Sequence, residues 1–372
     1  MRIAFVTGLK RSTTKDSLGG RNQIVYKLVE GMAKRGHQVT FIGTGDSQLP
    51  AEIIPIVDKA LMFQSPQEND FYFHTAYLSM MTKKMAEMAN QFDIIANHVY
   101  PEFLPLLVAN QIQTPIVTTT HAQVTPYLAK AMSGYKDSYF VFVSNSHRDL
   151  ARKYAAFPNS KTIYNGIDVD KFTFSNSAED HLLFFGRINY YKDETGKLVD
   201  AKGWKVSLDV AKESGESLEI AGPVLAGEFG SNAQQFYDTN VSPFIDGEKI
   251  KFVSKIQASE PVEFEQKVKL LGRAKALLFP INWDEPFGLV MVEALACGTP
   301  VIGFNRASVP EIIINGKTGF IVNNREEMIK IIPKIKDIKR EDCRQRAFDF
   351  TTDKMVNNYI EYYEEIYAQT KK

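Results

Sequence analysis

Residues 279–310 read FPINWDEPFGLVMVEALACGTPVIGFNRASVP, and this stretch decides the fold class. We expect an apolar strand that ends at Pro280, then a polar loop, and then a helix from Pro286 to about Cys297, because proline is favoured in the first turn of a helix. A second apolar run, Thr299–Phe304, follows as a strand. A strand, a helix and a strand in this order are typical of a parallel sheet covered by helices.

The same alternation of short apolar runs and longer amphipathic segments continues through the chain. Most of the short runs are apolar on both faces, as the buried strands of a parallel sheet are. A segment such as Ile24–Arg35, with apolar residues on one side, predicts a helix between two strands. The predicted strands are Ile3–Thr7, Gln38–Gly43, Asp93–Asn97, Pro115–Thr120 and Tyr139–Ser144 in a first series, and Leu182–Gly186, Leu218–Ala221, Ile250–Val253, Ala276–Pro280, Thr299–Phe304 and Gly319–Val322 in a second.

The two series of strands predict two α/β domains. The chain has 372 residues, which is longer than a single hydrophobic core usually supports. An Asn-Gly turn signal within residues 164–168 marks the expected junction. We therefore expect an N-terminal domain of residues 1–167 and a C-terminal domain of residues 168–353. The last segment, Lys354–Lys372, is expected to be a helix with an apolar stripe that must pack on another element.

Composition excludes several classes of protein. The 44 Lys and Arg residues balance 44 Asp and Glu residues, whereas an obligate nucleic-acid-binding protein carries a basic excess. No apolar run approaches the roughly 18–20 residues of a membrane-spanning helix, so we expect no transmembrane segment. Residues 1–8 are too short and too strand-like for a signal peptide. Two cysteines make no disulfide framework, so we expect a cytoplasmic protein, with peripheral association at a membrane left open.

Cofactor and metal motifs are missing from the sequence. The glycines after the first strand do not form the G-x-G-x-x-G pattern of a dinucleotide site. The six histidines show no close pair with the spacing of metal ligands, and a helix-starting aspartate explains Asp168 and Asp170 more simply than a metal site does. We therefore expect neither a cofactor nor a metal ion.

The stretch quoted first also carries the groups that suggest chemistry. The helix expected after Pro286 would place unpaired backbone N–H groups at the carboxyl end of a strand, where parallel sheets bind ligands and helix starts bind anions. Glu285 precedes this helix, and Glu293 lies inside it among apolar residues. A carboxylate in such surroundings needs a partner or a ligand. The alternative is a Glu293 on a solvated stripe, with Glu285 as a complement to the helix dipole.

Residues 285–293 (EPFGLVMVE) resemble the E-x7-E signature of retaining glycosyltransferases of family 4. Further pieces of the chain are similar to motifs of that family, in the expected order and over nearly the whole length. These pieces are Gly19-Gly20 before a helix, residues 35–39 (RGHQV), Thr119-Thr120-His121, residues 143–146 (VSNS), residues 165–168 (NGID), Phe185-Gly186-Arg187, Lys202-Gly203, residues 296–301 (ACGTPV) and residues 316–320 (GKTGF).

The resemblance implies the GT-B fold, which has two Rossmann-like doubly wound domains facing across a cleft. It implies that residues 1–167 form the acceptor-side domain, with helix 354–372 packing back on it, and that residues 168–353 bind the nucleotide-sugar donor. It also implies a retaining, metal-independent hexosyltransferase, which moves a hexose from a nucleoside-diphosphate sugar to a hydroxyl acceptor.

Site residues follow from the resemblance, position by position. Arg187 and Lys202 would hold the diphosphate and offset the charge of the leaving group. Glu293 would accept hydrogen bonds from the ribose hydroxyls, Glu285 would face the transferred sugar, and His121 would contact that sugar from the other domain. The implied donor-binding set also contains Gly19, Gly20, Gly222, Ile256, Phe287, Gly288, Leu289 and Val290.

One departure from the family pattern leaves the diphosphate lysine open. Family members place it about five residues after the arginine, where this chain has Lys192, but no glycine follows Lys192. Lys202 is followed by Gly203 and a predicted helix, so we prefer Lys202, with Tyr190–Asp200 as a surface loop. Purely structural roles stay open for Arg187 as a surface arginine, for His121 as a satisfied histidine at a sheet edge, and for Gly19-Gly20 as a turn.

The donor and the acceptor are less specified. A UDP-linked hexose is the default donor, with a GDP-linked hexose next, and the acceptor is a small molecule, a glycan or a lipid-linked molecule. Residues 1–167 carry 17 Lys and Arg against 12 Asp and Glu, so residues 168–372 have a net charge of −5. Local groups must therefore capture the diphosphate. Competing functions are a nucleotide-sugar epimerase or phosphorylase on the same fold, and a non-catalytic sugar-nucleotide-binding protein.

Overall fold

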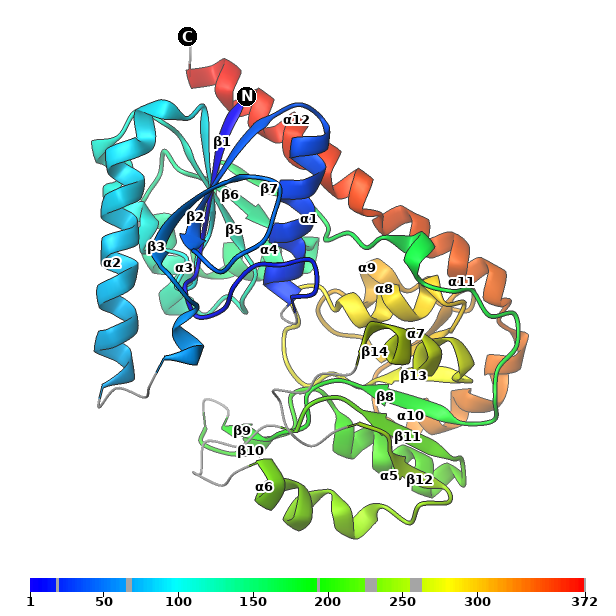
Figure 1. Ribbon diagram of the computed structural model, residues 1–372. Helices are drawn as coiled ribbons and strands as arrows, with labels where there is room; N and C mark the ends of the chain where they lie inside the picture. The colour runs from blue at the N-terminus through cyan, green and yellow to red at the C-terminus, as the bar shows by residue number, and fades with distance from the viewer. Residues whose placement is uncertain (18–19, 65–68, 193–194, 225–232, 255–262, 371–372) are drawn as a thin grey trace. The chain divides into compact units, whose positions relative to one another are not determined.

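The computed structural model describes the chain except for residues 18–19, 65–68, 193–194, 225–232, 255–262 and 371–372. The chain divides into two compact units. Unit 1 comprises residues 1–166 and 352–372, and unit 2 comprises residues 167–351. Each unit contains a parallel sheet with helices on its faces (Figure 1). The predicted fold class, with two Rossmann-like α/β parts, is confirmed.

The sheet of unit 1 has the order β3-β2-β1-β4-β5-β6-β7, and all neighbouring strands are parallel. The order runs outward in both directions from β1 and β4, which is the arrangement of a doubly wound sheet. The strands are β1 (Arg2–Thr7), β2 (Gln38–Thr44), β3 (Glu52–Val57), β4 (Ile94–His98), β5 (Ile116–Thr120), β6 (Tyr139–Phe142) and β7 (Ser160–Thr162). The helices are α1 (Gly20–Lys34), η1 (Leu61–Phe63), α2 (Asp70–Met88), η2 (Ala89–Gln91), η3 (Pro105–Gln111), α3 (Pro126–Ser133), α4 (Asn145–Tyr154) and α12 (Thr352–Thr370).

Helix α12 belongs to unit 1 and lies beside α1 (Figure 1). The Arg35 guanidinium, just after α1, donates to the Asp353 carboxylate at 2.8 Å. The Tyr359 hydroxyl lies 3.1 Å from Thr119 Oγ1 on β5. Tyr359 and Tyr363 are fully buried, and burial raises the pKa of both phenols. The apolar stripe predicted for the last helix is therefore part of the core of unit 1.

The sheet of unit 2 has the order β12-β11-β8-β13-β14-β15, again with parallel neighbours. Its strands are β8 (Leu182–Phe185), β11 (Leu218–Ala221), β12 (Ile250–Phe252), β13 (Ala276–Phe279), β14 (Val301–Phe304) and β15 (Gly319–Val322). Its helices are η4 (Val169–Lys171), α5 (Trp204–Ser214), α6 (Ala233–Asn240), η5 (Ser242–Phe244), α7 (Phe264–Arg273), α8 (Leu289–Ala296), α9 (Val309–Ile312), α10 (Arg325–Ile331), η6 (Ile332–Asp337), α11 (Arg340–Ala347) and η7 (Phe348–Phe350).

Two local expectations from the sequence are wrong. Helix α8 begins at Leu289, and Pro286 precedes it, because the capping residue Gly288 has a left-handed backbone (φ +81°) that a right-handed helix does not contain. The segment Tyr190–Asp200 is not a plain loop. Two short strands within it, β9 (Tyr191–Lys192) and β10 (Leu198–Val199), pair in antiparallel fashion.

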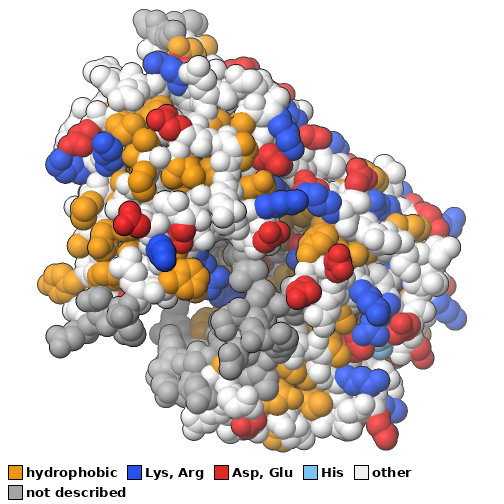
Figure 2. Space-filling model, in the orientation of Figure 1, with side chains coloured by type: hydrophobic (Ala, Val, Ile, Leu, Met, Phe, Trp, Pro, Cys, Tyr) orange, Lys and Arg blue, Asp and Glu red, His pale blue; other side chains and the backbone are white. Residues whose placement is uncertain are grey.

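The surface carries no strong segregation of charge on the face that Figure 2 shows, where acidic and basic side chains are interspersed. Within the described ranges, no helix is both long and apolar enough to cross a membrane.

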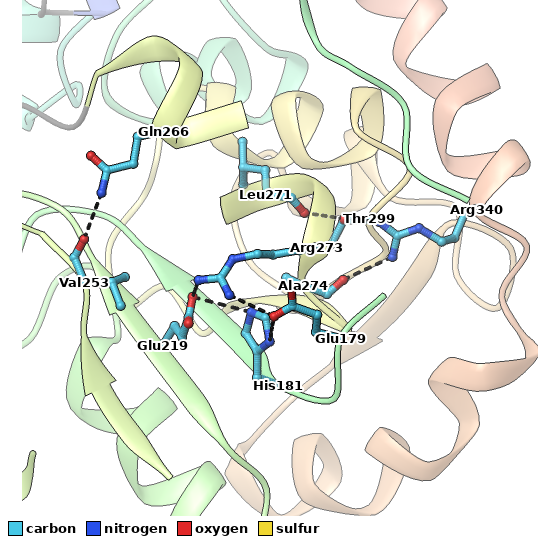
Figure 3. A network of polar contacts seen from close by, with 10 residues as sticks. All are labelled: Glu179, His181, Glu219, Val253, Gln266, Leu271, Arg273, Ala274, Thr299 and Arg340. Atoms are coloured by element: carbon cyan, nitrogen blue, oxygen red, sulfur yellow. Dashed lines mark hydrogen bonds and ion pairs between the residues drawn. The ribbon is translucent and has the colours of Figure 1, made fainter. Parts of the chain in front are cut away.

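An ion-pair network occupies the amino-terminal edge of the unit 2 sheet (Figure 3). Arg273, at the end of α7, donates to Glu179 at 2.8 Å and also pairs with Glu219 on β11. His181, which directly precedes β8, lies 3.5 Å from the Glu219 carboxylate. Burial lowers the pKa of His181. These side chains pair with one another at the amino ends of the strands, whereas open α/β sheets bind ligands at the carboxyl ends. The network therefore has a structural role.

Arg340, the first residue of α11, binds several carbonyl groups of unit 2 (Figure 3). Its guanidinium donates to the carbonyl oxygens of Gly272 (2.6 Å), Ala274 (3.1 Å) and Ser175 (2.7 Å), and to Thr299 Oγ1 (2.7 Å). Arginine can reach these acceptors together because its five N–H donors lie in one planar fork, which no other side chain has. Arg340 therefore ties α11 to the ends of α7 and to the segment before β14.

Replacing Arg340 by methionine removes this donor and keeps an apolar stem. We expect the free energy of unfolding of unit 2 to fall by about 3 kcal/mol, because buried acceptors that lose a charged donor each cost on the order of 1–3 kcal/mol. Urea unfolding followed by tryptophan fluorescence measures the change, since both tryptophans, Trp204 and Trp283, lie in unit 2.

The matched control is Lys317→Met, which removes an exposed cation 3.9 Å from Asp342 on the same helix as Arg340. We expect this change to alter the free energy of unfolding by less than about 0.5 kcal/mol. Equal losses in the two variants would contradict the role of Arg340.

Candidate functional site

The loops that follow three neighbouring strands of unit 2 carry most of the residues expected at a ligand site. Arg187 follows β8, Gly222 follows β11, and Glu285 lies in the loop after β13. The three strands are adjacent in the order β11-β8-β13. The carboxyl ends of parallel strands meet at one edge, which is where open α/β sheets bind ligands. The topology therefore brings these residues to the same edge of the sheet.

Two glycines allow the loops at this edge to touch. Gly222 has φ +129°, and a Cβ atom there would collide with the carbonyl oxygen of Gly186. Gly203 has φ +81°, and a Cβ atom there would collide with the carbonyl oxygen of Pro280. Any side chain at either position would be strained and would separate the loops. The two glycines thus fix the approach of the loops that carry Arg187, Lys202 and the residues after β13.

Lys202, Trp283 and Glu285 form one polar cluster. The Lys202 ammonium pairs with Glu285 Oε2 and lies 4.3 Å from the centre of the Trp283 ring. Trp283 Nε1 donates to the same carboxylate oxygen at 2.8 Å. The side chains of Lys202 and Glu285 are only 16% and 15% exposed. The sequence analysis missed Trp283, although it stands two residues before Glu285.

Arg187 adds a second positive charge to this cluster. Burial lowers the pKa of Lys202, Glu285 opposes this effect, and the charge of Arg187 lowers the pKa further, which means that the two cations lie near each other. Arg187 itself is exposed, and no described carboxylate forms an ion pair with it. Two cations beside one carboxylate leave a local positive charge, which favours an anionic ligand.

Asp200 holds the backbone just around Lys202. Its carboxylate accepts the N–H groups of Gly203 (2.8 Å) and Lys205 (2.7 Å) at the start of α5. Asn282 Nδ2 donates to the Asp200 carbonyl oxygen at 2.9 Å. Burial raises the pKa of Asp200 to about 7. Lys202 therefore stands on a segment that is tied both to α5 and to the loop after β13.

Glu293 is buried on α8 and pairs with Lys267 on α7. Because the Glu293 side chain is only 6% exposed, the alternative of a solvated stripe does not hold. The Lys267 ammonium also lies 5.8 Å from the centre of the Phe185 ring, at the end of β8. Lys267 was missed by the sequence analysis, since no motif marks it. The pair supplies a carboxylate and an ammonium at the edge of the same site.

The start of α8, at Leu289, lies between Glu285 and Glu293 in the sequence. Gly288 caps the helix, and Phe287 is buried with its carbonyl oxygen accepting a hydrogen bond from Ser308 Oγ at 2.6 Å. Leu289 and Val290 form the first turn, where backbone N–H groups have no acceptor within the helix. The positive end of the helix dipole therefore points out of this turn.

Unit 1 contains a pair of histidines at the carboxyl ends of two adjacent strands. His121 follows β5, and its Nε2 atom lies 2.9 Å from Nδ1 of His98, the last residue of β4. Burial lowers the pKa of His98 to about 3 and the pKa of His121 well below its usual value, so both rings are neutral near pH 7. The sequence analysis missed His98, because it ended the strand at Asn97.

Some of the remaining expected residues are described by the structure, and others are not. Gly20 is the first residue of α1. Gly19 and Ile256 lie outside the residues that the structure describes, and the side chain of Lys192 on β9 is also outside them.

The described residues contain no group of three or more His, Cys, Asp or Glu side chains that could hold a metal ion. Burial raises the pKa of Cys297 to about 12, so this thiol is no nucleophile near pH 7.

Comparison with known proteins adds two matches to family models. The model described as "Glycosyltransferase Family 4" matches residues 18–171, and the model described as "Glycosyl transferases group 1" matches residues 195–350. The chain is 22% identical over 396 residues to N-acetyl-alpha-D-glucosaminyl L-malate synthase of Bacillus anthracis, covering 96% of this chain and 97% of the relative.

Two solved structures share the fold. Sucrose-phosphate synthase from Thermosynechococcus elongatus superimposes with a TM-score of 0.75 at 17% identity, covering 99% of each chain. HepE of Anabaena in complex with UDP superimposes with a TM-score of 0.71 at 16% identity, covering 97% of this chain and 99% of that one. HepE has also been solved in complex with UDP-glucose.

The raised pKa of Asp200 predicts how the stability of unit 2 depends on pH. The pKa is about 7 in the folded chain and 3.8 for an unperturbed aspartate, so between these values the folded form binds more protons. The stability that Asp200 contributes is therefore full below about pH 4 and is lost as the pH rises through about 7. Asp200→Asn abolishes this dependence.

We expect the free energy of unfolding of the wild-type chain, minus that of Asp200→Asn, to fall from about pH 4 to about pH 8, with a slope of at most about 1.4 kcal/mol per pH unit. Urea unfolding followed by tryptophan fluorescence gives both values. A difference that stays constant over this range would show that Asp200 is ionised with an ordinary pKa.

Proposed function

Since the chain belongs to glycosyltransferase family 4 and is a glycosyltransferase, we propose that it transfers a hexose from a nucleoside-diphosphate sugar to a hydroxyl group, with retention of anomeric configuration and without a metal ion. The observation that carries the proposal is the cluster of Arg187, Lys202 and Glu285. A departing nucleoside diphosphate is the anion that two such cations can stabilise.

Unit 2 is the donor-binding part in this proposal. Arg187 and Lys202 hold the diphosphate, and the N–H groups at the start of α8 add the positive end of a helix dipole. Lys202 is preferred to Lys192 as the diphosphate lysine because it already pairs with Glu285. When the diphosphate binds, it competes with Glu285 for the ammonium. The carboxylate of Glu285 is then available to the hydroxyls of the transferred sugar.

The ribose is assigned to Glu293. Its carboxylate is buried and is paired with Lys267. Ribose hydroxyls can donate to the carboxylate oxygen that Lys267 leaves free. Gly222, which allows the loop after β11 to approach Gly186, is assigned to the base of the donor. The complexes of HepE with UDP and UDP-glucose support a UDP-linked hexose as the donor here.

The chemical step needs no protein nucleophile. The bond between the anomeric carbon and the phosphate oxygen breaks, and the acceptor oxygen forms its bond on the same face of the sugar. The acceptor proton passes to the departing phosphate oxygen. Preorganised cations and backbone dipoles stabilise the charge on that phosphate, and such groups supply a large part of enzymatic rate enhancement. Unit 1 supplies His121 to the sugar and takes the acceptor.

A thermal-shift screen of UDP, GDP and their hexose conjugates tests donor binding. Ligand that binds the folded state raises the melting temperature according to RT ln(1 + [L]/Kd), so the correct base gives the larger shift. We expect UDP to stabilise the chain. Absence of a shift with every nucleotide would overturn the donor site.

Lys202→Met and Glu293→Gln test the assignment within that site. We expect each to weaken UDP binding at least about tenfold, because each removes a charge-assisted hydrogen bond worth on the order of 1.5–3 kcal/mol. Lys205→Met and Glu216→Gln are matched controls, since Lys205 pairs with Asp209 on α5 and Glu216 pairs with Lys275. Wild-type affinity in Lys202→Met would refute the assignment of the diphosphate lysine.

Product analysis separates transfer from the competing functions. A transferase releases the nucleoside diphosphate only when an acceptor hydroxyl is present or water replaces it, whereas an epimerase returns a nucleotide sugar with altered stereochemistry. A phosphorylase would require inorganic phosphate.

A further inference from the structure

Two imidazole rings share one hydrogen bond at the carboxyl ends of adjacent parallel strands in unit 1. His98 ends β4, and His121 follows β5. Nδ1 of His98 lies 2.9 Å from Nε2 of His121. A neutral imidazole has one donor and one acceptor nitrogen, so one ring donates and the other accepts. The direction of this bond decides what His121 offers at its other nitrogen, Nδ1.

The surroundings of His98 fix the direction. Its ring is fully buried and stacks on Phe5, with 5.5 Å between ring centres. Its other nitrogen, Nε2, is buried and has no hydrogen-bond partner among the described residues. A proton on Nε2 would be a buried donor without an acceptor, which folded proteins rarely contain, whereas a lone pair there is an acceptor left empty.

The charge of Arg21 helps to keep both rings neutral, as the shared hydrogen bond requires. Arg21 lies in the first turn of α1, and its positive charge acts on both rings, lowering the pKa of each. The backbone N–H groups of His121 and Ala122, in the segment after β5, lie near the buried Glu102 carboxylate. His147 Nε2 lies 2.9 Å from the Ala122 carbonyl oxygen and anchors the same segment.

We propose that His98 is a positioning residue for His121: His98 donates its Nδ1–H to His121 Nε2, so that His121 carries its own proton on Nδ1 and presents an N–H donor. The inference rests on the proposed function, in which His121 contacts the transferred sugar. Its partner is then an oxygen lone pair of that sugar, from a hydroxyl or an ether oxygen. His121 is partly exposed, so this N–H is available to a ligand.

Proton–nitrogen correlation spectra of the whole chain with nitrogen-15 histidine, at about pH 7.5, report the tautomers directly, since neutral rings protonated at Nδ1 and at Nε2 differ in their two nitrogen shifts. We expect His98 and His121 both to be protonated at Nδ1. Loss of one ring's signals in His98→Asn and in His121→Gln assigns the two rings. A His121 protonated at Nε2 in the wild-type chain overturns the proposal.

Two substitutions of His98 separate positioning from packing. In His98→Asn, the side-chain amide stands where Nδ1 stood and can still donate to His121. His98→Phe keeps the stack on Phe5 and removes the donor. We expect kcat/KM to stay within about twofold in His98→Asn and to fall about tenfold in His98→Phe, the value of one hydrogen bond. We also expect the proton of His121 to be shared between the two tautomers in His98→Phe, because no group at position 98 then selects one of them.

Equal losses in both variants, with the His121 tautomer unchanged, would show a structural role only and overturn the proposal. If His98→Phe does not fold, the wild-type spectrum still decides the direction of the bond. The spectrum does not depend on donor binding, and UDP stabilisation tests unit 2, so a failure of the proposed function and a failure of this inference are distinguishable.

Discussion

Parallel strand pairing determines where the loops with polar residues gather within each unit. Every strand of a parallel sheet sends its following loop to the same edge. In unit 2, this edge receives Arg187, Gly222 and the loop with Glu285, although these positions lie far apart in the sequence. In unit 1, it receives His98 and His121 from neighbouring strands. The opposite edge of unit 2 holds the network around Arg273, where each charge has a partner within the protein.

Two lysine–carboxylate pairs lie almost out of contact with solvent in unit 2. They are Lys202 with Glu285 and Lys267 with Glu293. Removing one partner of such a pair costs more than the pair contributes, because the other charge is left desolvated. Each pair therefore holds its side chains in place. In the proposed function, a donor that brings an anion to Lys202 and hydroxyls to the carboxylates loses little free energy in ordering these groups.

Sequence patterns predicted most of the fold because buried parallel strands are apolar on both faces. The strand Leu218–Ala221 was predicted with its observed bounds. Edge strand β3 (Glu52–Val57) was missed because several of its side chains are exposed or half-buried, which breaks the apolar run. The family motifs identified Lys202 and Glu293. Trp283, which lies against Lys202, and Lys267, which pairs with Glu293, belong to no motif and are brought there by three-dimensional packing. His98 could have been found, because it follows Asn97 at the end of a predicted strand next to the one that leads to His121.

The distribution of charge explains why local contacts, and not the net charge, determine what unit 2 can bind. Residues 167–351 carry 24 Lys and Arg against 28 Asp and Glu, a net charge of −4. Several of these carboxylates pair with a basic side chain, such as Glu219 with Arg273 and Glu216 with Lys275. Charges separated by more than a Debye length of about 8–10 Å are largely screened by salt. An anion at the carboxyl edge therefore responds to Arg187, Lys202 and the start of α8. Acidic residues that are paired within the protein, or that lie farther from this edge than the screening length, contribute little to the potential there.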